Sequence, residues 1–256
     1  MKNPETIKIG VIVSLTGNSG ILGDYTLKGV QYAVDEQNSK VGLLGRKIEL
    51  DLRDSKADPK EGINVICKMM EQKNKPFMVY SITSGVSQAI KPETKANKII
   101  LMSAVGTDRF LEESKFTVRN FVAAATIGKQ IKESGYSGKI IGDPLMAYPD
   151  VEKAAGSALK GIHYLDLAFN PKSKDTTTRA FIKGFESKFK TLPQNFSVIT
   201  YDGVKLLFSI IEKAGTLNPD VIIEELNHLQ DYEGVFGPVS VSERNIKYRF
   251  VFKTWN

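Results

Sequence analysis

The sequence has few of the residues and motifs that mark hydrolases, metal enzymes or disulfide-linked domains. It contains one cysteine and two histidines, and we find no G-x-S-x-G, H-E-x-x-H or phosphate-loop motif. A lone cysteine excludes a disulfide within the chain. Because Cys67 lies in the apolar segment GINVICKMM, we expect a buried structural thiol. We expect no metal, no cofactor and no enzymatic activity.

Long apolar runs and runs of one charge are also missing. No apolar stretch approaches the ~20 residues that span a bilayer, and the first residues, MKNP, lack the hydrophobic core of a signal peptide. The 35 basic and 29 acidic residues give a net charge of +6, but they are spread along the chain. This distribution favours an ordinary solvated surface over nucleic-acid binding, so the sequence predicts a soluble globular protein.

Strands and helices alternate in the first half of the chain. The continuous apolar run IGVIVSL predicts a strand buried on both faces of a parallel sheet, followed by a helix over 25–37 with Asp24 as its N-cap. A second helix starts at Asp58-Pro59, and Ile63 lies on its predicted apolar face. The predicted strand KIELDLRDS precedes this helix, and the predicted strands PFMVYSI and KIILMSAVG follow it. This alternation predicts an α/β fold with a parallel sheet and right-handed crossovers.

The second half is less regular. Residues 115–120 form a predicted extended link, and shorter strands and helices follow, among them the strand GIHYLDLAF. The polar segment NPKSKDTTT then breaks the pattern, as a crossing between lobes would. Two long helices, TRAFIKGFESKFKT and NFSVITYDGVKLLFSIIEKAG, precede a short helix and the closing strands.

The turn from Ser81 to Ser84 is the strongest candidate for a binding site. Ligands of open α/β sheets bind beyond the carboxyl ends of the strands. A helix that starts there offers unpaired amide N–H groups that suit a carboxylate, and the Ser84 hydroxyl would add a donor. The alternative is that Thr83 or Ser84 only caps its helix.

Two carboxylates at the end of another strand allow a different interpretation. Asp51 and Asp54 could hold a divalent cation, as paired carboxylates do in phosphoacceptor domains. The first strand, however, ends in SLTG and not in an acidic pair. We therefore favour a turn-stabilising role for these residues.

The order of elements and several local motifs resemble the type I periplasmic solute-binding proteins, in particular the leucine/isoleucine/valine-binding branch of ABC importers. The resemblance lies in SLTGNSGILGDYTLKGVQYAVDEQN, GLLGRKIELDLRDSKADP, VYSITSGVSQAIKPETKANKIILMSAVGT, the FIKGFESKF to TYDGVKLLFSIIEKAG block and GVFGPVSV. It implies two Rossmann-like lobes with parallel sheets and a ligand between them. The implied partners are the importer's membrane subunits, and the implied location is periplasmic or extracellular.

The resemblance also implies roles for individual residues. Ser84, with Ile82 and Thr83 beside it, would contact the carboxylate of an amino acid or another small carboxylate. Val105 would give a carbonyl to the ligand ammonium, and Thr107 a hydroxyl. Leu22 takes a wall position where relatives often carry an aromatic, and Asp143 falls near an acidic residue that pairs with the ammonium.

One block of the family pattern is absent between Arg119 and FVAAATIGKQIKESGYSGK. We therefore expect a complete first lobe over 1–119 and 176–235, and a reduced second lobe over 120–175 and 236–256. Hinge closure needs contacts from both lobes, so we expect weak or absent binding of free amino acids.

Two rival functions remain open. The reduced lobe could leave strand edges that a second copy covers, which predicts an oligomerising scaffold or a homodimer. A receiver-like or hydrolytic enzyme that uses Asp51 or Ser84 is the less favoured alternative.

Overall fold

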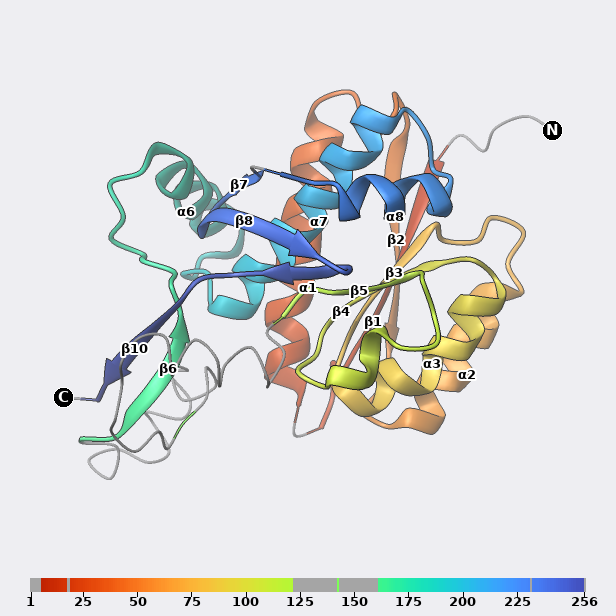
Figure 1. Cartoon of the computed structure of the whole chain (residues 1–256), viewed down its shortest axis with the longest axis horizontal. Helices are drawn as coiled ribbons and strands as arrows, with labels where there is room; N and C mark the ends of the chain where they lie inside the picture. Colours follow the sequence, from red (N-terminus) through yellow and green to blue (C-terminus); the bar gives the residue numbers. More distant parts are fainter. Residues whose placement is uncertain (1–5, 18, 122–141, 143–160, 231, 256) are drawn as a thin grey trace.

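The first strand, β1 (Thr6–Val13), lies inside a sheet, as its continuous apolar run predicts. We describe the fold from a computed structural model, which describes residues 6–17, 19–121, 142, 161–230 and 232–255 (Figure 1). β1 pairs in parallel with β2 (Lys47–Asp54) on one side and with β3 (Met78–Ile82) on the other. Its backbone groups are therefore satisfied along both edges.

The described strands form a sheet of eight and a sheet of two. The larger sheet has the order β2-β1-β3-β4-β5-β9-β8-β7, and β10 pairs with β6 in the smaller one. The strands not yet given are β4 (Ile100–Ala104), β5 (Thr117–Arg119), β6 (His163–Leu167), β7 (Tyr232–Gly234), β8 (Gly237–Ser242), β9 (Asn245–Lys247) and β10 (Phe250–Thr254). Pairing is parallel from β2 to β9, whereas β8–β9, β7–β8 and β6–β10 are antiparallel. The α/β fold with a mostly parallel sheet is confirmed.

The closing strands differ from the predicted lobe boundary at 236. β8 and β9 belong to the larger sheet, because Arg119 of β5 pairs with Asn245 and its amide donates to the carbonyl of Arg244. Only β10 leaves this sheet to pair with β6. The division of the chain into lobes otherwise stays a prediction.

Helices cover both faces of the larger sheet (Figure 1). On one face lie α1 (Gly20–Ser39) and α7 (Asn195–Ala214), whose apolar residues share a core with Ile9 and Val11 of β1. On the other lie α2 (Pro59–Met70) and α3 (Ser84–Ala96), which pack with Ile12. The remaining helices among the described residues are the 3-10 turn η1 (Asp108–Leu111), α6 (Thr176–Phe189) and α8 (Pro219–Asn227).

Two details of the predicted helices were wrong. α1 begins at Gly20, so Asp24 lies inside it and pairs with Lys28 at 2.6 Å. This earlier start depends on Gly23, where a Cβ atom would lie 1.6 Å from the carbonyl oxygen of Ser14. In α2, Ile63 is 45% exposed, so it does not lie on the buried face where it was predicted.

Two other predictions for α2 concern its N-cap and the burial of its cysteine. Asp58 caps α2 as expected by accepting from the amides of Lys60 and Glu61. Cys67 is only partly buried and packs beside the α2–α3 cluster.

The elements predicted between residues 122 and 160 lie outside the described residues, apart from Gly142, which forms a bridge with Tyr164.

A buried asparagine links the chain after β5 to three other segments. The Asn120 amide group donates to the hydroxyl of Tyr80, at 2.9 Å, and to the carbonyl of Ile199, at 2.8 Å. Its side-chain oxygen accepts from the hydroxyl of Tyr248, which follows β9. Asn120 is fully buried, so these bonds fix both chain segments against β3 and α7.

Asp202 of α7 is a buried carboxyl group that holds the turn between β7 and β8. It accepts from the amides of Val235, at 2.9 Å, and Phe236, at 3.2 Å. Burial raises the pKa of Asp202 to about 7, and Glu233 adds to this increase, whereas the two amide hydrogen bonds lower it. The folded protein therefore retains a proton that the unfolded chain releases near the ordinary value of 3.8.

We predict that Asp202 makes the protein less stable as the pH rises. Its contribution is present below the unfolded pKa and is lost between about pH 4 and about pH 7, with a slope of at most ~1.4 kcal/mol per pH unit. Asp202→Asn should remove this slope from the free energy of unfolding, measured with urea across that range. Asp24→Asn, at an exposed side chain of α1, is the control and should keep the wild-type slope. An unchanged slope in Asp202→Asn would contradict the assignment.

Candidate functional site

Three loops meet at one edge of the larger sheet because β1, β3 and β4 run parallel with matched ends. Ile12 pairs with Ser81, and Ile82 pairs with Ala104. The segments that follow these strands, residues 14–17, 83–84 and 105–107, therefore emerge at the same edge. This is the edge at which ligands of such sheets bind, and the predicted residues of the first lobe lie on or next to these segments.

The start of α3 is the part of this edge best suited to an anion. α3 begins at Ser84, and no side chain caps it, in contrast to α2 with its Asp58 cap. Ser84 and Gly85 are both exposed. The predicted capping role of Thr83 is therefore not seen, and the first amides of α3 and the Ser84 hydroxyl lie at the surface, where the positive end of the helix dipole favours negative charge.

Thr83 has an unusual backbone conformation for its residue type. Its φ is 69° and its ψ is 126°, whereas threonine, with a branched Cβ, disfavours positive φ. Its side-chain oxygen is buried and has no hydrogen-bond partner among the described residues. Such strain and unpaired polar atoms gather at ligand sites more often than elsewhere.

Arg119 holds the loop after β4 by a hydrogen bond to the loop backbone, a role that the sequence did not indicate. Arg119 is 5% exposed, donates to the carbonyl of Thr107 at 2.9 Å and donates to Asn245 at 3.0 Å. Val105 is 2% exposed and packs in the α2–α3 cluster, so it can offer a ligand only its backbone. Thr107 is partly exposed.

The other predicted contact residues are Ile82, Leu22 and Asp143. Ile82 is 2% exposed and can also contribute only backbone groups. Leu22 lies in the first turn of α1 and packs partly against the main core. Leu15, in the loop after β1, and Ile21, next to Leu22 in the sequence, are 37% and 42% exposed, and the sequence did not single them out. Asp143 lies outside the described residues.

The paired carboxylates at the end of β2 do not form a cation site. Asp54 accepts from the Leu15 amide at 2.9 Å and from the Thr16 hydroxyl at 2.7 Å, and Asp51 accepts from Arg53. Burial would raise the pKa of Asp54, but its hydrogen bonds together outweigh burial and lower that pKa. Within the described ranges, no group of three or more His, Cys, Asp or Glu side chains could hold a metal ion. Asp54 therefore fixes the loop after β1.

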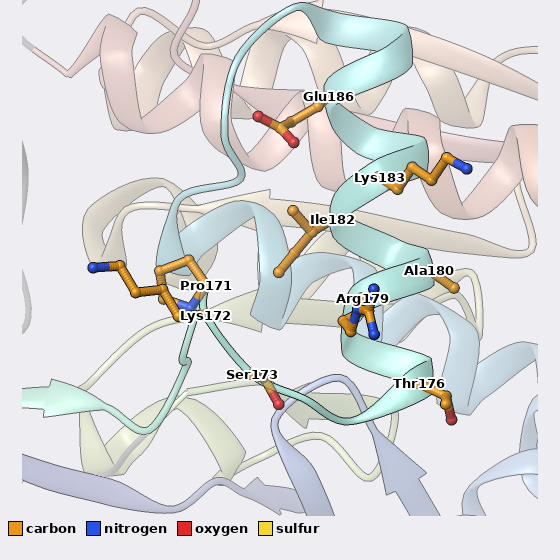
Figure 2. Close-up of a pocket in the computed structure, with 9 residues that line it drawn as sticks. All are labelled: Pro171, Lys172, Ser173, Thr176, Arg179, Ala180, Ile182, Lys183 and Glu186. Carbon is orange, nitrogen blue, oxygen red and sulfur yellow. The ribbon is translucent and has the colours of Figure 1, made fainter.

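A separate pocket of about 480 Å³ lies along α6, away from the strand ends (Figure 2). Figure 2 shows the side chains that line it: Pro171, Lys172, Ser173, Thr176, Arg179, Ala180, Ile182, Lys183 and Glu186. Apart from Ile182, which is 8% exposed, these are surface or partly exposed residues. The pocket has no buried polar group that would orient a ligand, so we place the candidate site at the start of α3.

The comparison with protein families decides the identity. The profile of the family described as Periplasmic binding protein matches residues 6–122 and residues 116–247. The chain belongs to the periplasmic binding protein family. The resemblance seen in the sequence is thereby confirmed, and this type I binding protein falls in a family of solute-binding proteins, not of enzymes. Among the described residues, no helix has the length and apolar character needed to cross a membrane.

Curated relatives match one part of the binding protein. The Leu/Ile/Val-binding protein BraC3 of Rhizobium johnstonii is 36% identical over 101 residues, which are 40% of this chain and 27% of the relative. The Leu/Ile/Val-binding protein homolog 2 of Brucella abortus is 39% identical over 101 residues, again 40% and 27% of the two chains. The match thus spans about a quarter of the length of these relatives.

Solved structures share the fold over nearly the whole chain. The leucine binding protein LivK of Thermotoga maritima superposes with a TM-score of 0.80 at 18% identity and covers 97% of this chain and 95% of its own. LivJ of Streptococcus pneumoniae, in complex with isoleucine, has a TM-score of 0.79 at 18% identity, with 98% and 96% covered. A Rhodopseudomonas palustris solute binding protein, in complex with benzoate, has a TM-score of 0.79 at 17% identity, with 97% and 93% covered.

We predict that Thr83→Gly will stabilise this binding protein. Glycine adopts positive φ freely and would release strain of about 1–3 kcal/mol, against an entropic cost of about 0.5–1 kcal/mol. The free energy of unfolding, measured with urea, should rise by roughly 1 kcal/mol. Thr177→Gly, at an exposed helical position of α6, is the control and should lower it. A clear loss of stability in Thr83→Gly would show that Thr83 is not strained.

Proposed function

We propose that the protein binds a small carboxylate between two lobes and delivers it to an ABC importer outside the cytoplasm. The observation that carries the proposal is the uncapped start of α3 at the carboxyl ends of β3 and β4. Its exposed amides and the Ser84 hydroxyl are donors without an acceptor among the described residues. A carboxylate supplies two acceptor oxygens and the charge that the helix dipole favours.

The ligands named for the structural neighbours support this ligand class. Isoleucine was bound to LivJ, benzoate to the Rhodopseudomonas palustris protein, and leucine to an ABC transporter substrate-binding protein of Desulfitobacterium hafniense. Each of these ligands carries a carboxylate, whereas benzoate has no ammonium group. At the described strand ends the carboxylate of Asp54 already accepts hydrogen bonds from Leu15 and Thr16, so it is not available to pair with a ligand ammonium. We therefore propose that the first lobe recognises the carboxylate. Selection of amino acids would depend on an acidic residue of the other lobe, for which Asp143 is our candidate.

The proposed delivery depends on hinge closure, in which the ligand favours the closed state by touching both lobes. The family matches this chain in two segments that overlap at residues 116–122. Two overlapping matches support a missing block of the family pattern at this point, where the sequence placed it. A smaller second lobe leaves fewer contacts for the closed state, so we propose weak binding, with a Kd in the millimolar range or above.

We expect Ser84→Ala to weaken carboxylate binding about tenfold, the loss of one charge-assisted hydrogen bond. Leucine, isoleucine and benzoate would be titrated into the wild type and the variant, with affinity read from protein NMR shifts. Ser187→Ala, at an exposed position of α6, is the matched control and should bind as the wild type does. Equal affinities in Ser84→Ala and the control, or no shift with any of these carboxylates, would overturn the proposal.

A second function, assembly with another copy, is favoured by the small sheet. Within the described ranges β6 is the strand paired with β10, and residues 250–252 are only half-buried. A second copy could pair with this strand edge. Light scattering should then show a dimer mass that grows with protein concentration, and Phe250→Pro, which removes an amide that faces away from β6 and so cannot donate to a second copy's strand, should reduce it. A monomer mass at all concentrations would exclude this function.

A further inference from the structure

Three serine side chains form a closed network beneath the candidate site. Ser81 lies in β3, Ser87 in α3 and Ser103 in β4, and all three are fully buried. The hydroxyl oxygens of Ser81 and Ser87 are 2.8 Å apart, and those of Ser87 and Ser103 are 2.7 Å apart. The Ser103 hydroxyl also donates to the backbone carbonyl of Ser81 at 2.9 Å.

The direction of every hydrogen bond in this network follows from the proton count. Each hydroxyl has one proton, and Ser103 gives its proton to the Ser81 carbonyl. Ser103 must then accept from Ser87, and Ser87 must accept from Ser81. The network is therefore a ring that begins and ends at Ser81, with a single arrangement of protons. Hydrogen bonds linked in this way polarise one another and strengthen in a buried environment.

The ring joins the three elements that shape the candidate site. Ser81 and Ser103 face each other in the parallel pairing of β3 with β4, just before the loops that carry Thr83 and Val105. Ser87 lies one turn into α3, and its amide donates to the carbonyl of Thr83 at 3.0 Å. The ring thus ties the start of α3 to both strand ends.

Packing alone does not require these hydroxyls. The surroundings are apolar, with Val86, Ile90 and Val105 in the same cluster, and a buried hydroxyl costs free energy unless it is bonded. Compared with alanine side chains, the three hydroxyls add hydrogen bonds that fix the orientation of α3 relative to β3 and β4. Thr83, held at positive φ between Ser81 and Ser87, lies in the segment that this geometry constrains.

We propose that Ser81, Ser87 and Ser103 are positioning residues that hold the first amides of α3 in place for the carboxylate. This inference rests on the proposed function. A preorganised site loses less conformational freedom when a ligand binds. Breaking the ring should therefore weaken binding through Ser84 and its neighbouring amides, although no ring hydroxyl touches the ligand.

The test compares Ser87→Ala with Ser197→Ala. Ser197 is equally buried but its hydroxyl has no partner among the described residues, so it controls for the loss of a buried serine. We expect Ser87→Ala to raise the Kd for the tightest of leucine, isoleucine and benzoate about fivefold to tenfold, and Ser197→Ala to leave it unchanged. In a Ser84→Ala background Ser87→Ala should still raise the Kd, because the first amides of α3 remain and would still contact the carboxylate.

A second measurement works without a ligand. Hydrogen exchange of the amides of residues 88–91, which report on the first turn of α3, should be about tenfold faster in Ser87→Ala. It should match the wild type in Ser197→Ala. Ser81→Ala, which leaves the bond between Ser87 and Ser103, provides a milder break if Ser87→Ala does not fold.

The outcomes separate the two proposals. If no carboxylate binds the wild type, the proposed function fails, and the exchange rates alone decide whether the ring positions α3. If carboxylates bind but Ser87→Ala and Ser81→Ala keep the wild-type Kd, the positioning role is overturned while the proposed function stands. Unchanged exchange at residues 88–91 in both variants would overturn it as well.

Discussion

The parallel register of β1, β3 and β4 is the constraint on which both the core and the candidate site depend. Strands that run parallel with matched ends bring their following loops to one edge, and the crossover helices must then pack on the two faces. Val79 and Tyr80, neighbours in β3, accordingly belong to different hydrophobic clusters. A slip of one residue would exchange the two faces, so burial on both sides fixes the register and, with it, the position of every loop at the edge.

Buried polar groups complete what the apolar core leaves unspecified. Asn120, Arg119 and Asp202 each bond to a segment far away in the sequence, and each is nearly or fully buried. Hydrophobic packing does not choose one direction for a chain segment, whereas a buried hydrogen bond is lost unless the geometry is right. Asn120 and Tyr248 hold the segments after β5 and β9 in this way.

The described part of the site offers donors and apolar surface but little negative charge. The start of α3 and Thr107 supply N–H and hydroxyl groups, and the side chains of Leu15 and Ile21 are exposed apolar groups of the segments after β1. Asp54 has its oxygens committed to the loop after β1. Such an edge would distinguish anions from cations better than it distinguishes one carboxylate from another. The choice among small carboxylates would therefore depend on the residues of the other lobe that face this edge.

The sequence by itself determined the alternation of strands and helices and the capped start of α2 at Asp58, because these follow from local periodicity and turn chemistry, and it placed the candidate site at the carboxyl ends of the strands. Tertiary structure decided the rest. The start of α1 depends on the contact of Gly23 with the end of β1, and the place of β8 and β9 depends on pairing between Arg119 and Asn245. The serine ring joins residues from three elements. Long-range contacts of this kind leave no periodic signal, since their partners are separated in the chain and meet only when the sheet has formed.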